Sequence, residues 1–143
     1  MTSTNGTQPG VIRVPLRWRD LDHQAHVYHA TMLTLLDEAR THWLRDVIGV
    51  DFPDEYVVVR IEIDYVAELL IDAGAVDVEF KVSRVGQRSL TTAEVVRTPQ
   101  GVEVARTAVT MVMWDRDERR SRLLTDAERA AAATMMAPGV THA

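Results

Sequence analysis

Carboxylates and imidazoles gather in a short polar stretch within residues 17–40, RWRDLDHQAHVYHATMLTLLDEAR. Asp22 lies seven residues before His29, the first residue of a predicted helix. Free N–H groups at a helix N-terminus can hold an anion or polarise a carbonyl oxygen. A carboxylate aimed at the same carbonyl could attack it or activate a water molecule. The spacing therefore suggests acyl transfer or hydrolysis of an activated carbonyl such as a thioester. The open alternative is that Asp22 only makes an Asx turn in the loop.

The histidines of this stretch raise the question of a metal site. His23, His26 and His29, with Asp20 and Asp22, supply the right atom types. The three-residue spacing would place the imidazoles on one face only in a helical loop, and the HExxH pattern of zinc hydrolases is absent. Solvated or hydrogen-bonding histidines are favoured, and no metal is predicted.

Two further groups are candidates for the site. Glu38, on the predicted helix, is a possible second carboxylate if it points toward the sheet; the alternative is that it pairs with an arginine. Arg84 and Arg88 flank a turn at Gly86, and Ser89 follows. This turn could bind the phosphates of a nucleotide-bearing substrate, or it is a solvated hairpin.

The elements around this stretch follow from hydrophobic periodicity. Ile12, Val14, Leu16 and Trp18 alternate with polar residues and predict a half-buried strand, which Pro15 favours at a sheet edge. From about residue 30 to 48 the period becomes helical and Gly49 is placed to end the helix. The apolar stripe of that helix contains Met32, Leu35, Leu36, Ala39, Trp43 and Val47.

Four more strands linked by short connections are predicted after the helix. In the first, Val57, Val59, Ile61, Ile63 and Tyr65 are expected to face one way. Strands then follow near residues 76–83, 90–97 and 102–114, the last with a bulge near 105–106. A capping box at residues 125–128 predicts a short C-terminal helix. The pattern indicates an α+β protein in which one helix lies across a five-stranded antiparallel sheet.

The length of 143 residues predicts one core, in residues 11–124, between a disordered tail at 1–10 and a short helix and tail at 125–143. The net charge of −5 gives no positive field for nucleic acid or an anionic membrane. Cysteine is absent, which excludes disulfides and a thiol nucleophile. Neither a signal peptide nor a membrane span is predicted, and a cytoplasmic protein is expected. The apolar run at residues 56–63 predicts a sheet edge covered by a second subunit.

The stretch resembles the signature of hotdog-fold acyl-CoA thioesterases of the 4-hydroxybenzoyl-CoA thioesterase type. Those sequences read R-x-x-D-x-D-x-x-G-H-V, then Asn-Asn or Tyr-His, then an apolar helix ending E-x-A-R. The matching residues are Arg17, Asp20, Asp22, His26, Val27, Tyr28, His29, Glu38, Ala39 and Arg40. IEIDYVAEL resembles the family's second strand. Ala25 replaces the usual glycine, and the proline usual after the strand tyrosine is missing.

The resemblance implies a hotdog fold, a five-stranded antiparallel sheet wrapped around one long helix. It also implies homodimers, or tetramers built from dimers, with the active site between subunits. Asp22 would be the nucleophile or general base, and the backbone N–H of His29 would polarise the thioester carbonyl. His26, Tyr28, Arg88 and Ser89 would bind an acyl-CoA substrate, with coenzyme A as part of the substrate and no separate cofactor.

Two other functions stay open on sequence grounds. The same residues would serve a thioesterase acting on acyl carrier protein, because an arginine-rich surface suits either carrier. A non-catalytic hotdog protein that binds acyl-CoA is an alternative of a different class. A hydratase is disfavoured, since that chemistry on this fold relies on a differently placed His–Asp or His–Glu pair.

Overall fold

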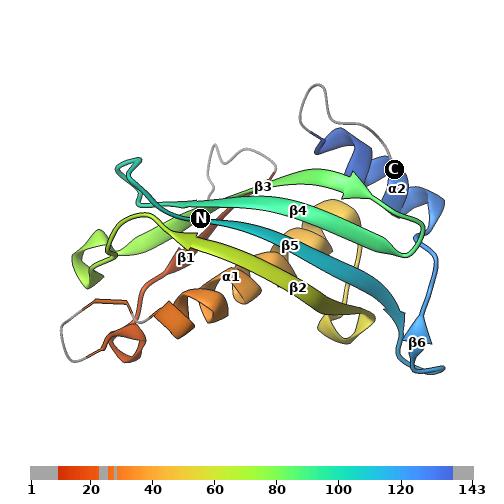
Figure 1. Ribbon diagram of the computed structural model, residues 1–143, viewed down its shortest axis with the longest axis horizontal. Coiled ribbons are helices and arrows are strands. Elements are labelled where there is room, and N and C mark those ends of the chain that lie inside the picture. Colours follow the sequence, from red (N-terminus) through yellow and green to blue (C-terminus); the bar gives the residue numbers. More distant parts are fainter. Residues whose placement is uncertain (1–9, 23–25, 28, 137–143) are drawn as a thin grey trace.

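A computed structural model of the chain describes residues 10–22, 26–27 and 29–136 (Figure 1). It contains a curved antiparallel sheet, a long helix and a short C-terminal helix. The helices are α1 (His29–Trp43) and α2 (Asp126–Thr134). The strands are β1 (Val11–Pro15), β2 (Tyr56–Tyr65), β3 (Ala75–Val85), β4 (Ser89–Arg97), β5 (Glu103–Asp115) and β6 (Arg120–Ser121).

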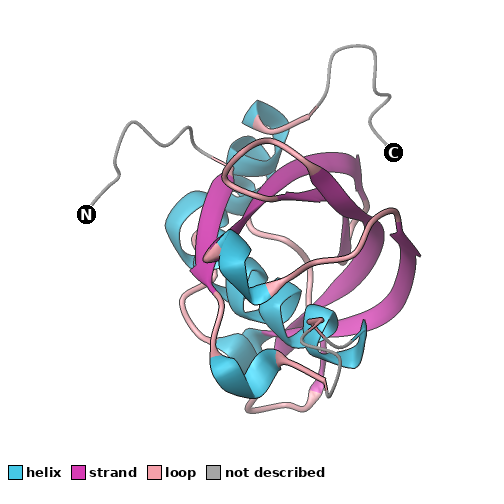
Figure 2. Ribbon diagram, turned by 90° about the vertical axis from the view of Figure 1, so that its left-hand side faces the viewer, coloured by secondary structure: helices cyan, strands magenta, loops and turns pink. Residues whose placement is uncertain are grey.

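The strand order is β1-β3-β4-β5-β2, and the short β6 pairs with the end of β5. The sheet curls around α1, as the end-on view shows (Figure 2), so the predicted sheet wrapped around one long helix is confirmed. One predicted detail is wrong. The connection from β2 to β3 is not a short hairpin, because these consecutive strands lie at different places in the sheet and the segment 66–74 must cross between them.

The apolar stripe of α1 fills the concave side of the sheet. Leu35, Leu36, Ala39 and Trp43 are all buried. The Trp43 ring stacks on Phe80 of β3, with ring centroids 5.0 Å apart. Past Trp43 the helix widens into one π-helical turn and ends at Gly49. The φ of Gly49 is 96°, in the left-handed region that glycine adopts without steric strain. The predicted helix is therefore confirmed at both ends, because its own periodicity and its terminating glycine define it.

The first strand is shorter than predicted and ends at Pro15. Asp20 is buried, and its carboxylate accepts a hydrogen bond from the backbone N–H of Arg17 at 2.8 Å. This contact turns residues 18–20 into a 3-10 helical turn and leaves the Trp18 side chain 80% exposed. Trp18 is thus not on the buried face of a strand, because the local carboxylate cap ends the strand first. The predicted edge position of the strand is confirmed.

Strand β2 is an edge strand with a bulge that changes which side chains share a face. Its pairing with β5 slips between Val58 and Arg60, so Val59 has no partner. Val58 pairs opposite Met111 and Ile61 opposite Val109. Met111 and Val109 both belong to the buried core, so Val58 and Ile61 lie on the core-facing side of the sheet. The prediction that Val57 and Val59 share a face with Ile61 is therefore wrong, because one extra residue reverses the alternation.

Two predictions for the C-terminal half are confirmed. In β5, Val104 and Ala105 are both buried where the pairing with β4 slips, as a bulge requires. Helix α2 begins after Thr125, whose hydroxyl accepts a hydrogen bond from the Glu128 N–H at 3.0 Å. The chain after α2 then pairs with Val82, covering β3 where β1 no longer reaches it.

No helix in the described part of the chain is long and apolar enough to cross a membrane.

Candidate active site

The loop before α1 is closed by reciprocal hydrogen bonds between Asp22 and His26. The Asp22 N–H donates to the His26 carbonyl at 2.8 Å, and the His26 N–H donates to Asp22 Oδ1 at 3.2 Å. The Val27 N–H donates to the Leu69 carbonyl at 2.8 Å, which ties the loop to the segment after β2. The Asp22 carboxylate therefore closes the loop through the N–H four residues on, and the same contact fixes the orientation of that carboxylate. The Asx turn that the sequence left open would use the N–H of Gln24, which lies outside the described residues, so that alternative stays a prediction.

A pocket of about 320 Å³ lies between this loop, the first turn of α1 and the end of β2. Its polar lining includes Asp22, His26, His29 and Glu68. Its apolar lining comes from Val27, Met32, Val66 and Leu69. A carboxylate and a helix N-terminus thus share one cavity with an apolar wall, an arrangement suited to an acyl group whose carbonyl is to be attacked.

The first residue of α1 is held by Tyr65, the last residue of β2. The Tyr65 hydroxyl donates a hydrogen bond to the His29 carbonyl at 2.6 Å. The two rings meet edge to face with centroids 6.3 Å apart. The Tyr65 hydroxyl keeps its proton at neutral pH because the ordinary pKa of the phenol is 10.0, and partial burial raises that pKa. The sequence placed Tyr65 on a strand but gave no sign of its partner in α1.

His26 has a side-chain partner that the sequence did not indicate. Its Nε2 lies 3.1 Å from Oε2 of Glu68, which stands on the segment after β2. The backbone of His26 also bridges to Leu70. His26 is therefore held by both its main chain and its ring, and Glu68 brings a further carboxylate to the rim of the pocket.

The other two carboxylates of the motif do not line this pocket. Asp20 is 3% exposed and lies 3.5 Å from the Arg17 guanidinium through its Oδ2. Glu38 lies half-buried on α1, with Oε1 3.5 Å from Arg17 Nη2. Glu38 thus makes the arginine pair that the sequence offered as its alternative role, and Asp22 is the motif carboxylate that reaches the pocket.

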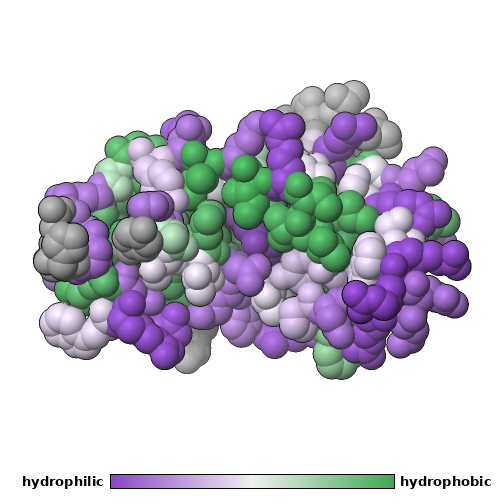
Figure 3. All heavy atoms as spheres, turned by 60° about the horizontal axis from the view of Figure 1, so that its bottom comes forward, coloured by the Kyte–Doolittle hydropathy of each residue, from purple (hydrophilic) through white to green (hydrophobic). Residues whose placement is uncertain are grey.

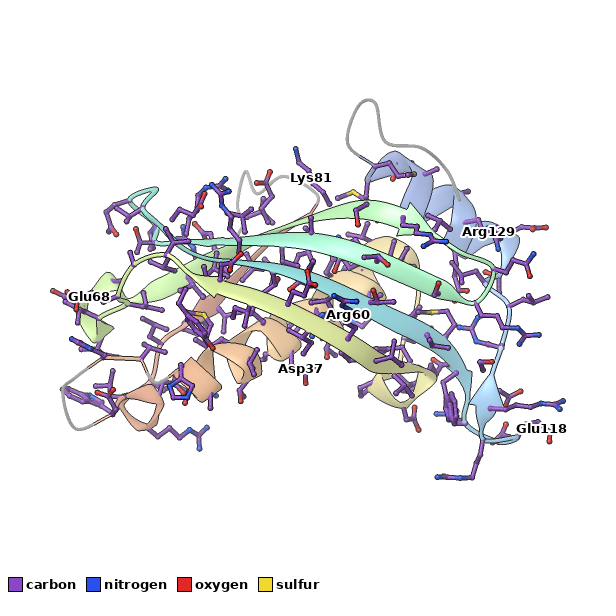
Figure 4. All side chains as sticks on the ribbon, in the orientation of Figure 1. Asp37, Arg60, Glu68, Lys81, Glu118 and Arg129 are labelled. Atoms are coloured by element: carbon purple, nitrogen blue, oxygen red, sulfur yellow. The ribbon has the colours of Figure 1, made fainter. Side chains whose placement is uncertain are left out.

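Arg88 and Ser89 lie at the opposite end of the molecule from the pocket. Arg88 donates to the Ser121 carbonyl at 2.9 Å, beside the β3–β4 turn. Arg129 of α2 donates to the Gly86 carbonyl of the same turn at 3.0 Å. Figure 4 shows Arg129 near one end of the long axis and the pocket residue Glu68 near the other. One subunit alone therefore does not bring Arg88 and Ser89 to Asp22.

Three residues named from the sequence lie outside the described residues: His23, Ala25 and Tyr28. The substrate-binding role of Tyr28 and the effect of Ala25 on the loop stay predictions. Among the described residues, no group of three or more His, Asp or Glu side chains is arranged to hold a metal ion.

A second polar cluster, unforeseen from the sequence, is buried between α1 and the sheet. Arg40 forms a bidentate salt bridge with Glu94 of β4. Its Nε lies 3.1 Å from Oε2, and its Nη2 lies 3.0 Å from Oε1. Thr92 and Thr107 donate to the same carboxylate at 2.9 and 2.8 Å. Glu94 occupies an inward position of β4 that the alternation of its neighbours would have marked as core.

The family model described as Thioesterase-like superfamily matches residues 16–137. A thioesterase from Thermus thermophilus, solved with coenzyme A and zinc, is 27% identical, with a TM-score of 0.75 over 89% of this chain and 93% of that one. A protein from Pseudomonas aeruginosa is 23% identical, with a TM-score of 0.80 over 90% and 92% of the two chains.

The 1,4-dihydroxy-2-naphthoyl-CoA thioesterase from Synechocystis is 17% identical, with a TM-score of 0.71 over 90% of this chain and 98% of that one. At this identity the likeness supports the fold and no more. No curated protein matched the sequence significantly.

Proposed function

Because this chain belongs to the thioesterase-like superfamily and is a thioester hydrolase, we propose that it hydrolyses acyl-CoA thioesters in the pocket between Asp22 and the start of α1. The observation that carries the proposal is the shared cavity, in which the Asp22 carboxylate and His29 line one apolar-walled pocket. The products would be a free acid and coenzyme A.

In this mechanism the His29 N–H holds the thioester carbonyl oxygen and stabilises the oxyanion that forms. One such donor is typically worth about 3–4 kcal/mol in the transition state. Asp22 takes a proton from a water molecule that adds to the carbonyl carbon, or attacks the carbon itself to form an anhydride that water then opens. The C–S bond breaks as the oxyanion collapses, and the coenzyme A thiolate leaves and takes up a proton.

Coenzyme A is the proposed carrier rather than acyl carrier protein. The Thermus thermophilus thioesterase, 27% identical to this chain, was solved with coenzyme A bound. His26 and Tyr28 are assigned to substrate binding near the carbonyl, and Arg88 and Ser89 to the phosphates. Coenzyme A enters as part of the substrate, and the proposed chemistry uses no separate cofactor.

A second copy of the chain is the proposed partner of β2. This strand forms a sheet edge with no hydrogen-bonded neighbour on its outer side among the described residues. Val57, Val59 and Ile61 on β2 are all more than a third exposed. Figure 3, which brings the lower side of Figure 1 forward, shows hydrophobic side chains gathered in a band on this side of the molecule. The backbone N–H and C=O groups along such an edge can pair with a strand of another chain.

Two β2 strands paired antiparallel about a two-fold axis would make one continuous sheet, with the same surface used by both subunits. The axis would also reverse the long direction of the partner. The end carrying the partner's Arg88 would then lie alongside the pocket end of the first subunit. This arrangement supplies a reason why Arg88 and Asp22 are far apart within one chain, and it places the active site between subunits.

Asp22→Asn is the direct test. Hydrolysis of short-chain, long-chain and aromatic acyl-CoAs is measured for the wild type and the variant. If Asp22 is the base or nucleophile, kcat falls by about 10²- to 10⁴-fold, as expected when a positioned catalytic group is lost. The amide has nearly the same shape, so the loop contact from the His26 N–H to Oδ1 is kept.

Glu38→Gln is the control, because it makes the same chemical change on a carboxylate outside the pocket. It should keep the wild-type rate. Full activity of Asp22→Asn, or a comparable loss in Glu38→Gln, would contradict the assignment of the base. A wild type that binds acyl-CoA but hydrolyses no thioester would favour the non-catalytic binding protein.

A further inference from the structure

Tyr65 and His29 both line the pocket and are joined by a hydrogen bond. Tyr65 is the last residue of β2 and is fixed there by its pairing with Ala105 of β5. His29 is the first residue of α1. Their side-chain-to-backbone hydrogen bond spans 36 residues of sequence and is 2.6 Å long. It links the end of the sheet edge to the beginning of the helix.

The start of a helix is where backbone order is lowest, because helix ends fray. The proposed reaction requires the N–H of His29, the first residue of α1, to point steadily at a carbonyl oxygen. A misplacement on the order of 1 Å in such a group can reduce a rate by about 10²-fold. A contact that anchors His29 therefore bears directly on catalysis.

We propose that Tyr65 is a positioning residue for the thioesterase reaction, anchoring His29 so that its N–H stays directed at the substrate carbonyl. The anchor has two parts: the hydroxyl holds the His29 carbonyl, and the phenol ring meets the His29 imidazole edge to face at 6.3 Å. The inference rests on the proposed function, because it assigns Tyr65 a part in the same site.

The hydroxyl is suited to this role under the conditions in which the enzyme would work. Tyr65 is 47% exposed, and with an ordinary pKa of 10.0 its phenol is a hydrogen-bond donor through neutral and mildly alkaline pH; partial burial raises that pKa. Its proton is directed at a backbone carbonyl rather than at the place of the substrate. Loss of the hydroxyl is therefore expected to change the chemical step more than substrate binding.

Tyr65→Phe removes the hydroxyl and keeps the ring. The matched control is Tyr56→Phe, which makes the same change at the first residue of the same strand. The Tyr56 hydroxyl is hydrogen-bonded with Thr41 Oγ1 at 3.2 Å, further along the same helix. Both variants lose one hydrogen bond between β2 and α1, but only one of these bonds is at the pocket.

Three quantities are measured on each variant: kcat and KM with the acyl-CoA that the wild type hydrolyses fastest, the ¹³C shift of the His29 carbonyl, and the ¹⁵N order parameter of the His29 amide. For Tyr65→Phe we expect kcat to fall about fivefold, which corresponds to one hydrogen bond of ordinary strength. KM should be unchanged, the carbonyl shift should move and the amide order should fall. Tyr56→Phe should leave all of these at wild-type values.

An unchanged kcat in Tyr65→Phe would overturn the proposal, and so would an equal loss in Tyr56→Phe, which would indicate general stability. A raised KM with unchanged kcat would also overturn it, since Tyr65 would then bind the substrate directly. The two NMR measurements need no substrate. If the wild type hydrolysed no thioester, the proposed function would fail, while the His29 carbonyl shift and amide order would still decide whether Tyr65 anchors the helix.

Discussion

Glu94 shows at the residue scale why a buried carboxylate need not be a catalytic base. Its two oxygens accept four hydrogen bonds, two from Arg40 and one each from Thr92 and Thr107. A carboxylate offers about four acceptor sites, so these are filled. Asp22 differs because it lines a cavity that a substrate can enter. Glu94 is therefore a structural group that joins α1 to the sheet.

Replacing Glu94 by Gln should destabilise the fold strongly. The substitution removes the buried carboxylate that pairs with the buried Arg40 guanidinium, a loss that typically costs about 3–5 kcal/mol. Asp37→Asn is the matched control, because Asp37 lies 3.4 Å from the same guanidinium but its side chain is 63% exposed. An exposed pair of this kind is typically worth about 0–1 kcal/mol. Urea unfolding measures the free energy of unfolding of both variants. Equal losses of that free energy in the two variants would contradict the role given to Glu94.

The residues that could be predicted from the sequence are those whose partners are close along the chain. Asp22 and His29 are seven positions apart, and a loop running into a helix brings them to one place. Tyr65 and Glu94 could not be predicted as contacts, because their partners lie 36 and 54 residues away. Periodicity gives the face of a strand on which a residue lies, but not what the curled sheet places opposite it.

At the element scale, α1 and β2 show where periodicity is sufficient and where it fails. The stripe of α1 is complete within the helix itself, so both its face and its end at Gly49 follow from local sequence. The alternation of β2 is interrupted by the unpaired Val59. The pairing with β5 determines where that bulge lies. The sequence does not indicate its position, because the residues there are consecutive valines. The helix could therefore be predicted in detail, and the strand only in outline.

Helix α2 is fixed by a carboxylate whose charge should make its docking sensitive to acid. Glu128 accepts two hydrogen bonds of 2.8 Å from the Arg122 guanidinium and one of 2.8 Å from the Thr125 N–H. Burial alone would raise the pKa of Glu128, but the bonds from Arg122 and Thr125 together lower it below its ordinary value of 4.5. A lowered folded-state pKa gives stability that is present above pH 4.5 and is lost as the pH falls through the folded value.

Glu128→Gln should therefore lower the free energy of unfolding at pH 7 by about 1.5–3 kcal/mol, the range of a hydrogen bond to a charged group. The difference in unfolding free energy between variant and wild type should begin to narrow below pH 4.5, where the carboxylate of the unfolded wild type becomes protonated, and should close as the pH falls through the lower folded-state pKa. Chemical denaturation at several pH values measures the gap. Glu118→Gln changes an exposed carboxylate beyond β5 and should have little effect. A gap for Glu128→Gln that is constant with pH would refute the charge argument.

At the scale of the whole molecule, the two ends of the long axis carry different parts of the proposed site. The pocket with Glu68 lies toward one end, and the β3–β4 turn beside Arg129 lies toward the other (Figure 4). The sequence predicts the fold because a helix and five strands of these lengths have few ways to cover their apolar faces. The separation of Asp22 from Arg88 follows from the strand order, which alternation along single strands does not specify.

Val59→Glu tests whether a second copy covers β2. A carboxylate there would be forced between two paired edges, so we expect the dimer to dissociate and the mass in solution to fall from about twice 16.1 kDa to 16.1 kDa. If the partner completes the site, kcat/KM should fall with the dimer fraction. Val102→Glu is the matched control, because Val102 is 54% exposed and Val59 57%, but Val102 lies at the β4–β5 turn. Sedimentation velocity measures the mass in solution of both variants. A dimer in Val59→Glu with full activity would place the subunit contact elsewhere.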